Sequence, residues 1–375
     1  MSSSSLPRPV PAPLPSHDRS LRLLVVTDAW YPQVNGVVRT LDTVAREASL
    51  LGHTVGFVTP DQFLTVPTPT YPEIRLALLP GRRLGRLIQA FAPDAIHIAT
   101  EGPLGWSARR LCLKRGLPFT TAYHTRFPEY VKARFGVPLA LTYRIVRHFH
   151  APSRGLLVAT RSLYDELAGR GFVNLRQWSR GVDLERFTPG PKDVLPDLPR
   201  PIFTYVGRLA VEKNIDAFLA LDLPGSKLVV GDGPEMARLK AAYPKAHFAG
   251  ARHGDDLAAY FRAGDVFVFP SRTDTFGLVM LEALACGLPV AAFPVPGPLD
   301  ILSPAVGAMD EDLAAACRRA LALDPAACRE HALGFTWAAT AAQFVHNIAP
   351  FHQDWPALPK PAAVQAAIPY DPKGK

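Results

Sequence analysis

Along most of the chain, short apolar runs alternate with longer segments in which apolar residues recur at helical spacing. The run LRLLVVTD at 21–28 is typical of a buried strand, and GVVRTLDTVAREASLLGH, which begins at Gly36, predicts a helix that stops near Gly52. Four more runs in the first half predict strands: TVGFVT, DAIHIA, PFTTAYHT and GLLVAT. We expect helices between them, including one long helix from about Glu129 to His150. Strands alternating with helices indicate a parallel sheet covered on both faces.

The alternation restarts after TPGPKDVLPDLPRP, a segment rich in proline and charge that begins at Thr188. Such a segment between two alternating patterns predicts an interdomain linker. Beyond it, further strands are predicted at IFTYVG, KLVVG, AHFAG, DVFVFP and PVAAF. We therefore predict an α/β protein of two Rossmann-like parallel-sheet domains facing a central cleft. The expected divisions are an arm at 1–20, a first domain at 21–187, the linker at 188–200, a second domain at 201–350 and a tail at 351–375.

Length and composition agree with two globular domains. The chain has 375 residues, 48% of them hydrophobic, and a domain commonly takes about 100–200 residues. No run of about 18 uncharged apolar residues occurs, so we expect no transmembrane helix. The Ser- and Pro-rich start lacks the apolar segment of a secretory signal and is interpreted as a disordered arm, with a second Pro-rich tail at the other end. Four cysteines without C-x-x-C spacing indicate reduced, buried thiols.

The positive charge is concentrated in the first half. Residues 1–200 carry a net charge of +11 and the remainder −3, which gives +8 overall. A basic half should meet an anionic partner, and we considered nucleic acid, an acidic membrane surface and an idle basic surface. No recognition motif with interleaved aromatic residues accompanies the charge, so we expect no nucleic-acid partner.

Candidate chemistry lies directly after predicted strands, where open α/β sheets bind ligands. In SRTDTFGLVMLEALACG, Asp274 follows a strand, the amides of Phe276, Gly277 and Leu278 open a helix, and Glu282 lies on it. Amides at a helix start can hold phosphate or hydroxyl oxygens, and a carboxylate can accept two hydroxyl hydrogen bonds from a ribose diol. Two carboxylates that flank a helix start therefore suit a sugar nucleotide.

Three other strand ends carry matching features. Asn35-Gly36 opens a helix, where a glycine lets backbone amides approach an anion. His124 closes a strand and could bind sugar hydroxyls or act as an acid or base, although a lone histidine is often a packed residue. Arg208 and Lys213 bracket one loop after a strand and suit a diphosphate.

Two motifs argue against other chemistry. VVGDGPEM contains Gly231 and Gly233 but not the full G-x-G-x-x-G pattern, so a nicotinamide enzyme is disfavoured. The acidic run from Asp310 to Asp312 matches a metal-binding D-x-D pattern by its letters, yet acidic residues are ordinary at the start of a helix. We expect no metal site and no cofactor.

Taken together, these motifs resemble the retaining, two-domain nucleotide-sugar glycosyltransferases of family 4, which have the GT-B fold. The resemblance covers about 21–350 and includes GRL…EKN, GDGP and the motif of a carboxylate, seven residues and a glutamate, in the expected order. The first carboxylate of that motif is usually glutamate. Here it is Asp274, one methylene shorter, which could alter the choice of donor sugar.

The resemblance implies a role for each candidate residue. Gly36 would approach the diphosphate, and His124 would lie near the donor sugar. Arg208 and Lys213 would neutralise the leaving diphosphate. Asp274 and the three amides that follow it would hold the sugar, and Glu282 would bind the ribose.

The phrases TDAWYPQVNGV, YHTRFPEY and WSRGVDLERF resemble a narrower branch that includes diacylglycerol glycosyltransferases and GDP-mannose-dependent alpha-mannosyltransferases. The resemblance implies a hexosyltransferase that uses a UDP- or GDP-sugar donor, and we expect a lipid acceptor such as diacylglycerol or a glycolipid. We expect a cytoplasmic enzyme bound peripherally to the anionic inner face of the cell membrane. The alternatives are a soluble sugar or polysaccharide acceptor, a nucleotide-sugar epimerase, and a non-enzymatic nucleotide-sugar binding protein.

Overall fold

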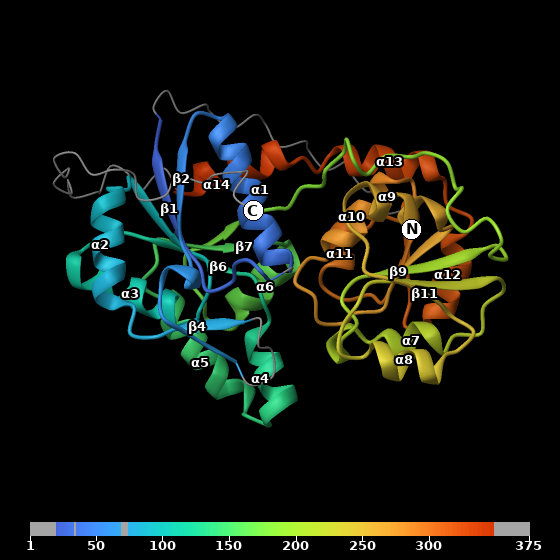
Figure 1. Cartoon of the computed structure of the whole chain (residues 1–375), viewed down its shortest axis with the longest axis horizontal. Coiled ribbons are helices and arrows are strands. Elements are labelled where there is room, and N and C mark those ends of the chain that lie inside the picture. Colours follow the sequence, from blue (N-terminus) through green and yellow to red (C-terminus); the bar gives the residue numbers. More distant parts are fainter. Residues whose placement is uncertain (1–19, 34, 69–73, 349–375) are drawn as a thin grey trace, which may run out of the picture.

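The structure is a computed structural model that describes residues 20–33, 35–68 and 74–348. Within these residues the chain forms two six-stranded parallel sheets and one short antiparallel hairpin. Figure 1 shows the two sheets in separate halves of the molecule, each with its own helices. The predicted architecture of two parallel-sheet α/β domains is confirmed. The predicted arm and tail lie outside the described residues, apart from Ser20.

The first sheet has the strand order β2-β1-β5-β6-β7-β8. Its strands are β1 (Arg22–Val26), β2 (Thr54–Val58), β5 (Ala95–Ile98), β6 (Thr120–Tyr123), β7 (Gly155–Val158) and β8 (Leu175–Gln177). Its helices are α1 (Gly36–Leu50), α2 (Gly81–Phe91), α3 (Pro103–Arg115), α4 (Phe127–Phe135), α5 (Leu139–His150) and α6 (Arg161–Gly169), and β3 (Thr65–Pro67) pairs with β4 (Arg75–Ala77). The winding direction reverses between β1 and β5, so the carboxyl ends of these strands are the expected ligand edge.

The second sheet has the order β11-β10-β9-β12-β13-β14. Its strands are β9 (Ile202–Val206), β10 (Ser226–Val230), β11 (His247–Gly250), β12 (Val266–Phe269), β13 (Val290–Ala292) and β14 (Gly307–Met309). The helices that follow β9 are α7 (Ile215–Leu219), α8 (Met236–Ala242), α9 (Gly254–Ala263), α10 (Leu278–Ala285), α11 (Pro298–Ile301), α12 (Leu313–Ala320), α13 (Pro325–Leu333) and α14 (Trp337–Ile348). This strand order is that of a Rossmann fold, with the reversal between β9 and β12.

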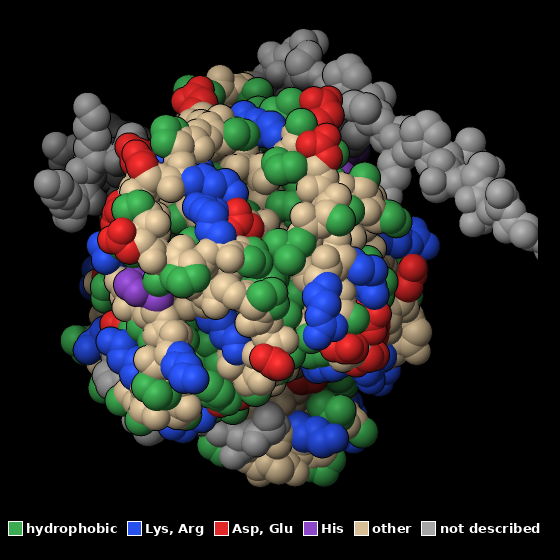
Figure 2. All heavy atoms as spheres, turned by 90° about the vertical axis from the view of Figure 1, so that its right-hand side faces the viewer, with side chains coloured by type: hydrophobic (Ala, Val, Ile, Leu, Met, Phe, Trp, Pro, Cys, Tyr) green, Lys and Arg blue, Asp and Glu red, His purple; other side chains and the backbone are tan. Residues whose placement is uncertain are grey.

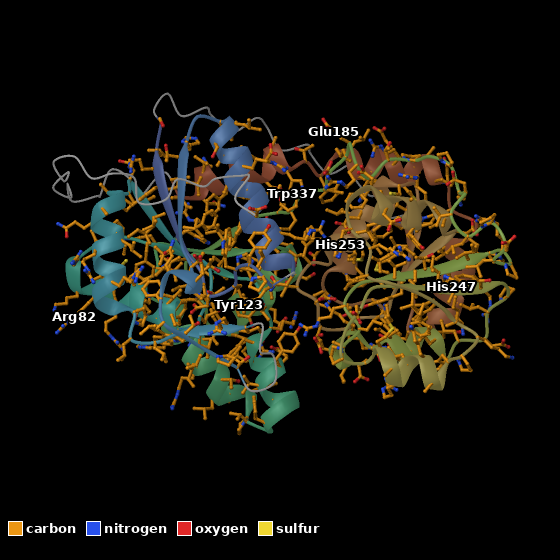
Figure 3. All side chains as sticks on the ribbon, in the orientation of Figure 1. Arg82, Tyr123, Glu185, His247, His253 and Trp337 are labelled. Atoms are coloured by element: carbon orange, nitrogen blue, oxygen red, sulfur yellow. The ribbon has the colours of Figure 1, made fainter. Side chains whose placement is uncertain are left out.

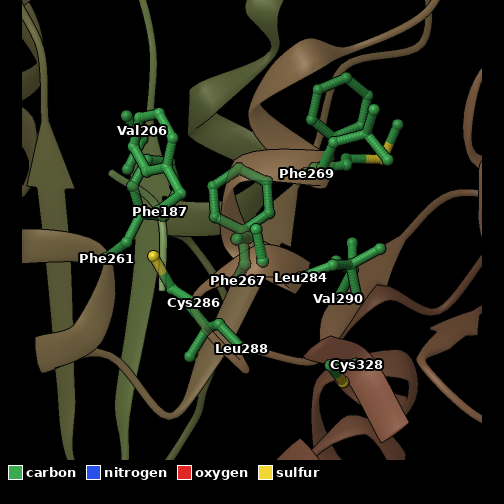
Figure 4. Close-up of a cluster of buried hydrophobic side chains, with 14 of the residues drawn as sticks. Phe187, Val206, Phe261, Phe267, Phe269, Leu284, Cys286, Leu288, Val290 and Cys328 are labelled. Carbon is green, nitrogen blue, oxygen red and sulfur yellow. The ribbon is translucent and has the colours of Figure 1, made fainter. Parts of the chain in front are cut away.

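Alternation along each strand gives every sheet two hydrophobic faces. In β1, Leu23 and Val25 pack against α1 and α14, whereas Leu24 and Val26 pack against α2 and α3. The same division holds in the second domain, and Figure 4 shows the cluster on one face of that sheet, around Phe267. Both sheets are therefore buried on both sides, as near-continuous apolar strands require.

The predicted helix from Glu129 to His150 is instead two helices, α4 and α5. Gly136 ends α4 in the left-handed region, with φ +68°, and Pro138 directly precedes α5. A glycine cap followed by a proline interrupts a helix because proline restricts the residue before it and lacks an N–H donor. The result is a helical hairpin directly after the strand end at His124.

The chain crosses between the domains earlier than the linker we expected at 188–200. Phe187 already packs in the core of the second domain. Val182 bridges Thr336 at the point where the chain returns, and α14 then packs on α1 of the first domain. Figure 1 shows this helix beside the first sheet, so the C-terminal end of the predicted second domain belongs structurally to the first.

The two crossing segments pack backbone against backbone. A Cβ on Gly181 would lie 2.4 Å from the Trp337 nitrogen, so only glycine fits there. Figure 3 shows Trp337 between the two halves of the molecule.

No helix within the described residues is both long and apolar enough to cross a bilayer. All four cysteines are buried and unpaired, as predicted.

Candidate active site at the domain junction

The predicted helix-start motif forms the turn from β12 into α10. Gly277 has φ +88°, and a Cβ there would lie 2.8 Å from the Met280 side chain and 2.9 Å from that of Phe269. Phe276 is buried in the core and fixes the turn. Among the described hydrogen bonds, none satisfies the backbone N–H groups of Phe276, Gly277 and Leu278. The turn therefore offers free amide donors at a helix start, the arrangement that binds anions.

Glu282 is the fifth residue of α10, about one turn into the helix. Its side chain is only 3% exposed, and its Oε1 accepts a hydrogen bond from Arg39 of α1 in the other domain. The other oxygen, Oε2, is buried without a hydrogen-bond partner. The Glu282 charge raises the pKa of Arg39 above its usual value. This ion pair ties the two domains together through the residue that we predicted to bind ribose.

Lys213 and Asp274, predicted from separate motifs, form an ion pair with Nζ and Oδ1 2.5 Å apart. The loop that carries Lys213 is fixed against the β12 turn because the Asn214 side-chain amide donates to the Pro270 carbonyl at 3.1 Å. Arg208 lies in the same loop after β9, and its side chain is exposed. The structure thus brings the predicted diphosphate cations to the same edge as the α10 turn.

Gly36 is the first residue of α1 and lies opposite the start of α10. A Cβ built on Gly36 would be 3.8 Å from the Leu278 side chain, an ordinary contact. Neighbouring protein atoms therefore do not require a glycine at this position. Asn35 caps the helix, with its side chain accepting from Val37 and Val38 at 3.0 Å.

His124 follows β6 and contacts both domains. Its carbonyl accepts a hydrogen bond of 2.8 Å from Thr275, between Asp274 and Phe276. Burial and the nearby charge of Arg180 lower the imidazole pKa well below 6.5, so the ring is neutral. His124 therefore lies beside the α10 turn, at the carboxyl end of β6, where the sequence predicted it.

Gly231 and Gly233 serve packing between loops. A Cβ on Gly231 would lie 1.9 Å from the Gly207 carbonyl oxygen, and one on Gly233 would lie 2.3 Å from that of Leu209. Both glycines therefore let the β10 loop pack under the loop that carries Arg208. These contacts account for both glycines without a bound dinucleotide.

The acidic run at 310–312 has structural roles. Asp312 caps α12 by accepting from Ala314 at 3.0 Å, and Asp310 pairs with Arg319 at 2.9 Å. Throughout the described residues, no group of three or more His, Cys, Asp or Glu side chains could hold a metal ion.

Three residues at the junction were not singled out from the sequence. Asp28 is buried after β1 and accepts from the Leu104 amide at 2.8 Å, which fixes the start of α3. Arg39 pairs with Glu282, and Arg180 lies beside His124. Arg39 lies one helical turn beyond the Asn35 cap. Its position near this helix start is the only feature of the sequence that could have marked Arg39 as a site residue.

Comparisons with known proteins define the class. A sequence profile of Glycosyltransferase Family 4 matches residues 34–186, and one of Glycosyl transferases group 1 matches residues 200–323. The chain is 32% identical over 311 residues to a GDP-mannose-dependent alpha-mannosyltransferase of Mycobacterium tuberculosis, covering 76% of this chain and 82% of the relative. The chain belongs to the family 4 glycosyltransferases.

Two further comparisons agree. The chain is 29% identical to the alpha-monoglucosyldiacylglycerol synthase of Streptococcus pneumoniae, over 81% of this chain and 79% of the relative. The fold matches sucrose-phosphate synthase from Thermosynechococcus elongatus with a TM-score of 0.66 and 22% identity, covering 88% and 98% of the two chains. The protein is therefore a glycosyltransferase with the GT-B fold.

Proposed function

We propose that the protein transfers a hexosyl unit from a UDP- or GDP-sugar to a membrane lipid, with retention of anomeric configuration. Diacylglycerol or a glycolipid is the acceptor in this proposal. The observation that carries it is the meeting of two helix starts, at Gly36 and at Leu278, with Glu282 and Lys213 on the same edge. Relatives named as a GDP-mannose-dependent enzyme and as a diacylglycerol glycosyltransferase support this choice of substrates.

The donor would lie between the two helix starts. The space beside Gly36 and the free amides of the α10 turn suit a diphosphate and the first sugar hydroxyls. Glu282 would exchange Arg39 for the ribose hydroxyls, and Asp274 would exchange Lys213 for the sugar. Because aspartate is one methylene shorter than the usual glutamate, its reach to the sugar would differ and could change sugar preference.

In the chemical step, the acceptor hydroxyl attacks the anomeric carbon from the face that the diphosphate leaves. The bond from that carbon to the diphosphate oxygen breaks, and the nucleoside diphosphate departs with the electron pair. A phosphate oxygen takes the proton of the acceptor hydroxyl. Arg208, Lys213 and the helix amides would stabilise the charge that develops on the diphosphate, while His124 would contact the sugar.

An exposed apolar and basic surface on the first domain supports the lipid acceptor. The α4–α5 hairpin begins three residues after His124 and exposes Phe135 by 70%, Ile145 by 48% and Leu141 by 42%. Arg144 is exposed on the same hairpin. Apolar side chains with nearby cations suit the boundary between lipid headgroups and acyl chains.

Further exposed cations of the first domain lie on α2 and α3. Arg82, Arg86 and Arg115 line one groove between these helices. None of the three forms an ion pair with a carboxylate in the part of the chain that the structure describes. Figure 3 shows Arg82 at the outer edge of the first domain, whereas Figure 2 shows cationic and anionic side chains mixed over the face of the second. Each well-placed cation contributes about 1 kcal/mol near an anionic surface.

Vesicle sedimentation and lipid transfer test this proposal together. The protein should sediment at low salt with vesicles that contain phosphatidylglycerol, and remain in the supernatant with phosphatidylcholine alone. Diacylglycerol in the same vesicles should be glycosylated by one donor of a UDP- and GDP-sugar panel, as read by mass. Arg144→Glu should weaken sedimentation and slow lipid transfer.

Arg318→Glu is the matched control, because Arg318 is an exposed arginine on α12 of the second domain and the charge change is the same. If the wild-type protein stays in the supernatant with anionic vesicles at low salt, the lipid acceptor is wrong. A product formed only on a soluble sugar or polysaccharide would then favour a soluble-acceptor alpha-mannosyltransferase. An isomerised nucleotide sugar formed without any acceptor would indicate an epimerase.

A further inference from the structure

Asp300, in α11 of the second domain, reaches across the domain junction to the start of α6 in the first domain. Figure 1 shows these two helices side by side where the two halves of the molecule meet. Asp300 Oδ1 accepts a hydrogen bond of 2.9 Å from the backbone N–H of Ser162, which lies 138 positions earlier in the chain.

This bond completes the capping of α6. The first turn of α6 contains no acidic residue in the sequence, and the Thr160 side chain caps the Leu163 amide. A carboxylate at a helix start is stabilised by the free amides and by the helix dipole. The second domain, through Asp300, therefore supplies the carboxylate that a first-domain helix lacks.

On its own side of the junction, Asp300 is fixed to the turn that would hold the donor sugar. Its Oδ2 accepts from the Gly297 amide at 3.3 Å, which caps α11. Gly297 has φ +98°, and a Cβ there would lie 3.1 Å from the Phe276 carbonyl oxygen and 3.6 Å from that of Asp274. The start of α11 thus packs on the backbone of this turn, so a displacement of the turn would move Asp300.

On the other side of the junction, α6 connects this contact to the α4–α5 hairpin. Glu166 of α6 pairs with Arg126 at 2.7 Å and accepts from Tyr143 of α5 at 3.4 Å. Glu166 and Ser162 are four residues apart, about 6 Å along the helix axis. One turn of α6 therefore separates the Asp300 contact from the hairpin whose apolar side chains we propose to meet the lipid.

Two other contacts described above join the domains, and both involve groups assigned to the donor. Glu282 pairs with Arg39, and Thr275 donates to the His124 carbonyl. In the proposed function the ribose takes Glu282 from Arg39, so this ion pair would be lost when the donor binds. Asp300 has no assigned role toward the donor, so its bond to α6 would persist in the donor complex.

Resting on the proposed glycosyl transfer, we propose that Asp300 is a positioning residue for transfer to the acceptor. Its carboxylate holds α6, and with it the α4–α5 hairpin, against the donor-sugar turn after the donor has displaced the Arg39–Glu282 pair. Asp300 itself touches neither the sugar nor the diphosphate. Its loss should therefore reduce attack by the lipid hydroxyl, which needs a positioned hairpin, more than attack by water on the same donor.

Small-angle X-ray scattering of the full chain tests the contact without any turnover. Asp300→Ala and Arg39→Gln each remove one contact between the domains, and the double variant removes both. We expect the increase in the radius of gyration of the double variant to exceed the sum of the two single increases, because either contact alone holds the domains together. Additive increases, or no increase in the double variant, would overturn the proposal.

Asp312→Ala is the matched control, because the Asp312 carboxylate also caps a helix but does so within its own domain. Combined with Arg39→Gln, it should leave the radius of gyration at the value of Arg39→Gln alone. An equal expansion in this control would overturn the specific role of Asp300.

Product analysis tests the positioning role with whichever donor of the UDP- and GDP-sugar panel gives glycosylated diacylglycerol. Asp300→Ala should lower the ratio of lipid glycosylation to donor hydrolysis at least about fivefold, while the affinity for UDP or GDP stays the same. Asp300→Asn should keep part of this ratio, because its amide oxygen still accepts from Ser162 but carries no charge.

An unchanged ratio in Asp300→Ala, or an equal fall in glycosylation and hydrolysis, would overturn the positioning role. The absence of a glycosylated lipid with every donor would instead be a failure of the proposed function. The two failures are distinguishable, because the scattering comparison requires neither donor nor acceptor.

Discussion

The two sides of the domain junction hold their charges in opposite ways. On the second-domain side, both predicted carboxylates are paired, Asp274 with Lys213 and Glu282 with Arg39. On the first-domain side, Arg180 and His124 have no carboxylate among their described partners. The difference indicates that a donor must exchange existing ion pairs on the second-domain side, whereas the charge of Arg180 is met by backbone carbonyls and not by a counter-ion.

The largest expected effect comes from removing a cation on the paired side. Lys213→Ala and Arg208→Ala should each raise the activation free energy by about 2–4 kcal/mol, which lowers turnover about 30- to 1000-fold. Each substitution removes a cation that would stabilise the negative charge on the departing diphosphate. Steady-state rates measure this, and Lys245→Ala, an exposed lysine of the same domain, is the control.

A double variant distinguishes catalysis from simple charge compensation. If Lys213 only neutralises Asp274, then Lys213→Ala with Asp274→Asn should regain activity relative to Lys213→Ala alone. We expect no such recovery. Wild-type turnover in both single variants would contradict the assignment of the diphosphate site.

The paired side of this comparison could be predicted from the sequence better than the unpaired side. Lys213, Asp274 and Glu282 each follow a strand within a recognisable motif, and the carboxyl ends of parallel strands share one edge. Which of them pair depends on the contact between loops, as with Asn214 and Pro270, and motif spacing carries no information on that contact.

Arg180 and Arg39 could not be identified in this way, because their roles arise from contacts between distant segments. Arg39 meets a residue 243 positions away, and His124 lies 56 positions from Arg180. The return of α14 to the first domain was missed for the same reason, since its helical pattern is the same on either domain. Short strands such as β8 and β14, with three residues each, gave too little alternation to detect.

A smaller effect is expected from the ion pair that spans the junction. Glu282→Gln should weaken binding of UDP or GDP by about 1.5–3 kcal/mol, because it removes a charged acceptor for the ribose hydroxyls. Arg39→Gln should instead strengthen binding, because it leaves the buried Glu282 carboxylate without its counter-ion and the ribose hydroxyls no longer compete with Arg39 for it.

Calorimetric titration with UDP and GDP measures both variants. The opposite signs of the two effects are the informative result. Equal weakening by Arg39→Gln and Glu282→Gln would mean that Arg39 contacts the nucleotide directly, and the exchange of ion pairs would then be wrong.

The last effect is on stability rather than on turnover or binding, and it concerns His97, a buried histidine of the first domain. Burial, with the charge of Arg180, lowers the pKa of His97 to about 3, against a usual value of 6.5. Above pH 6.5 the imidazole is neutral in both states and contributes nothing to pH dependence. As the pH falls from 6.5 toward 3, the unfolded chain binds a proton that the folded chain refuses, so stability is lost at about 1.4 kcal/mol per pH unit.

His97→Gln should remove this loss while keeping a partner for the Thr120 hydroxyl, which lies 2.9 Å from Nδ1. We expect the wild-type free energy of unfolding to fall more steeply than that of the variant between pH 6.5 and 5, as measured by urea denaturation. His253→Gln is the matched control, because His253 is an exposed imidazole in the second domain. Parallel pH dependences for the wild-type protein and His97→Gln would mean that the folded chain accepts the proton. The first-domain side would then tolerate additional positive charge, and its contrast with the paired side would lose its electrostatic basis.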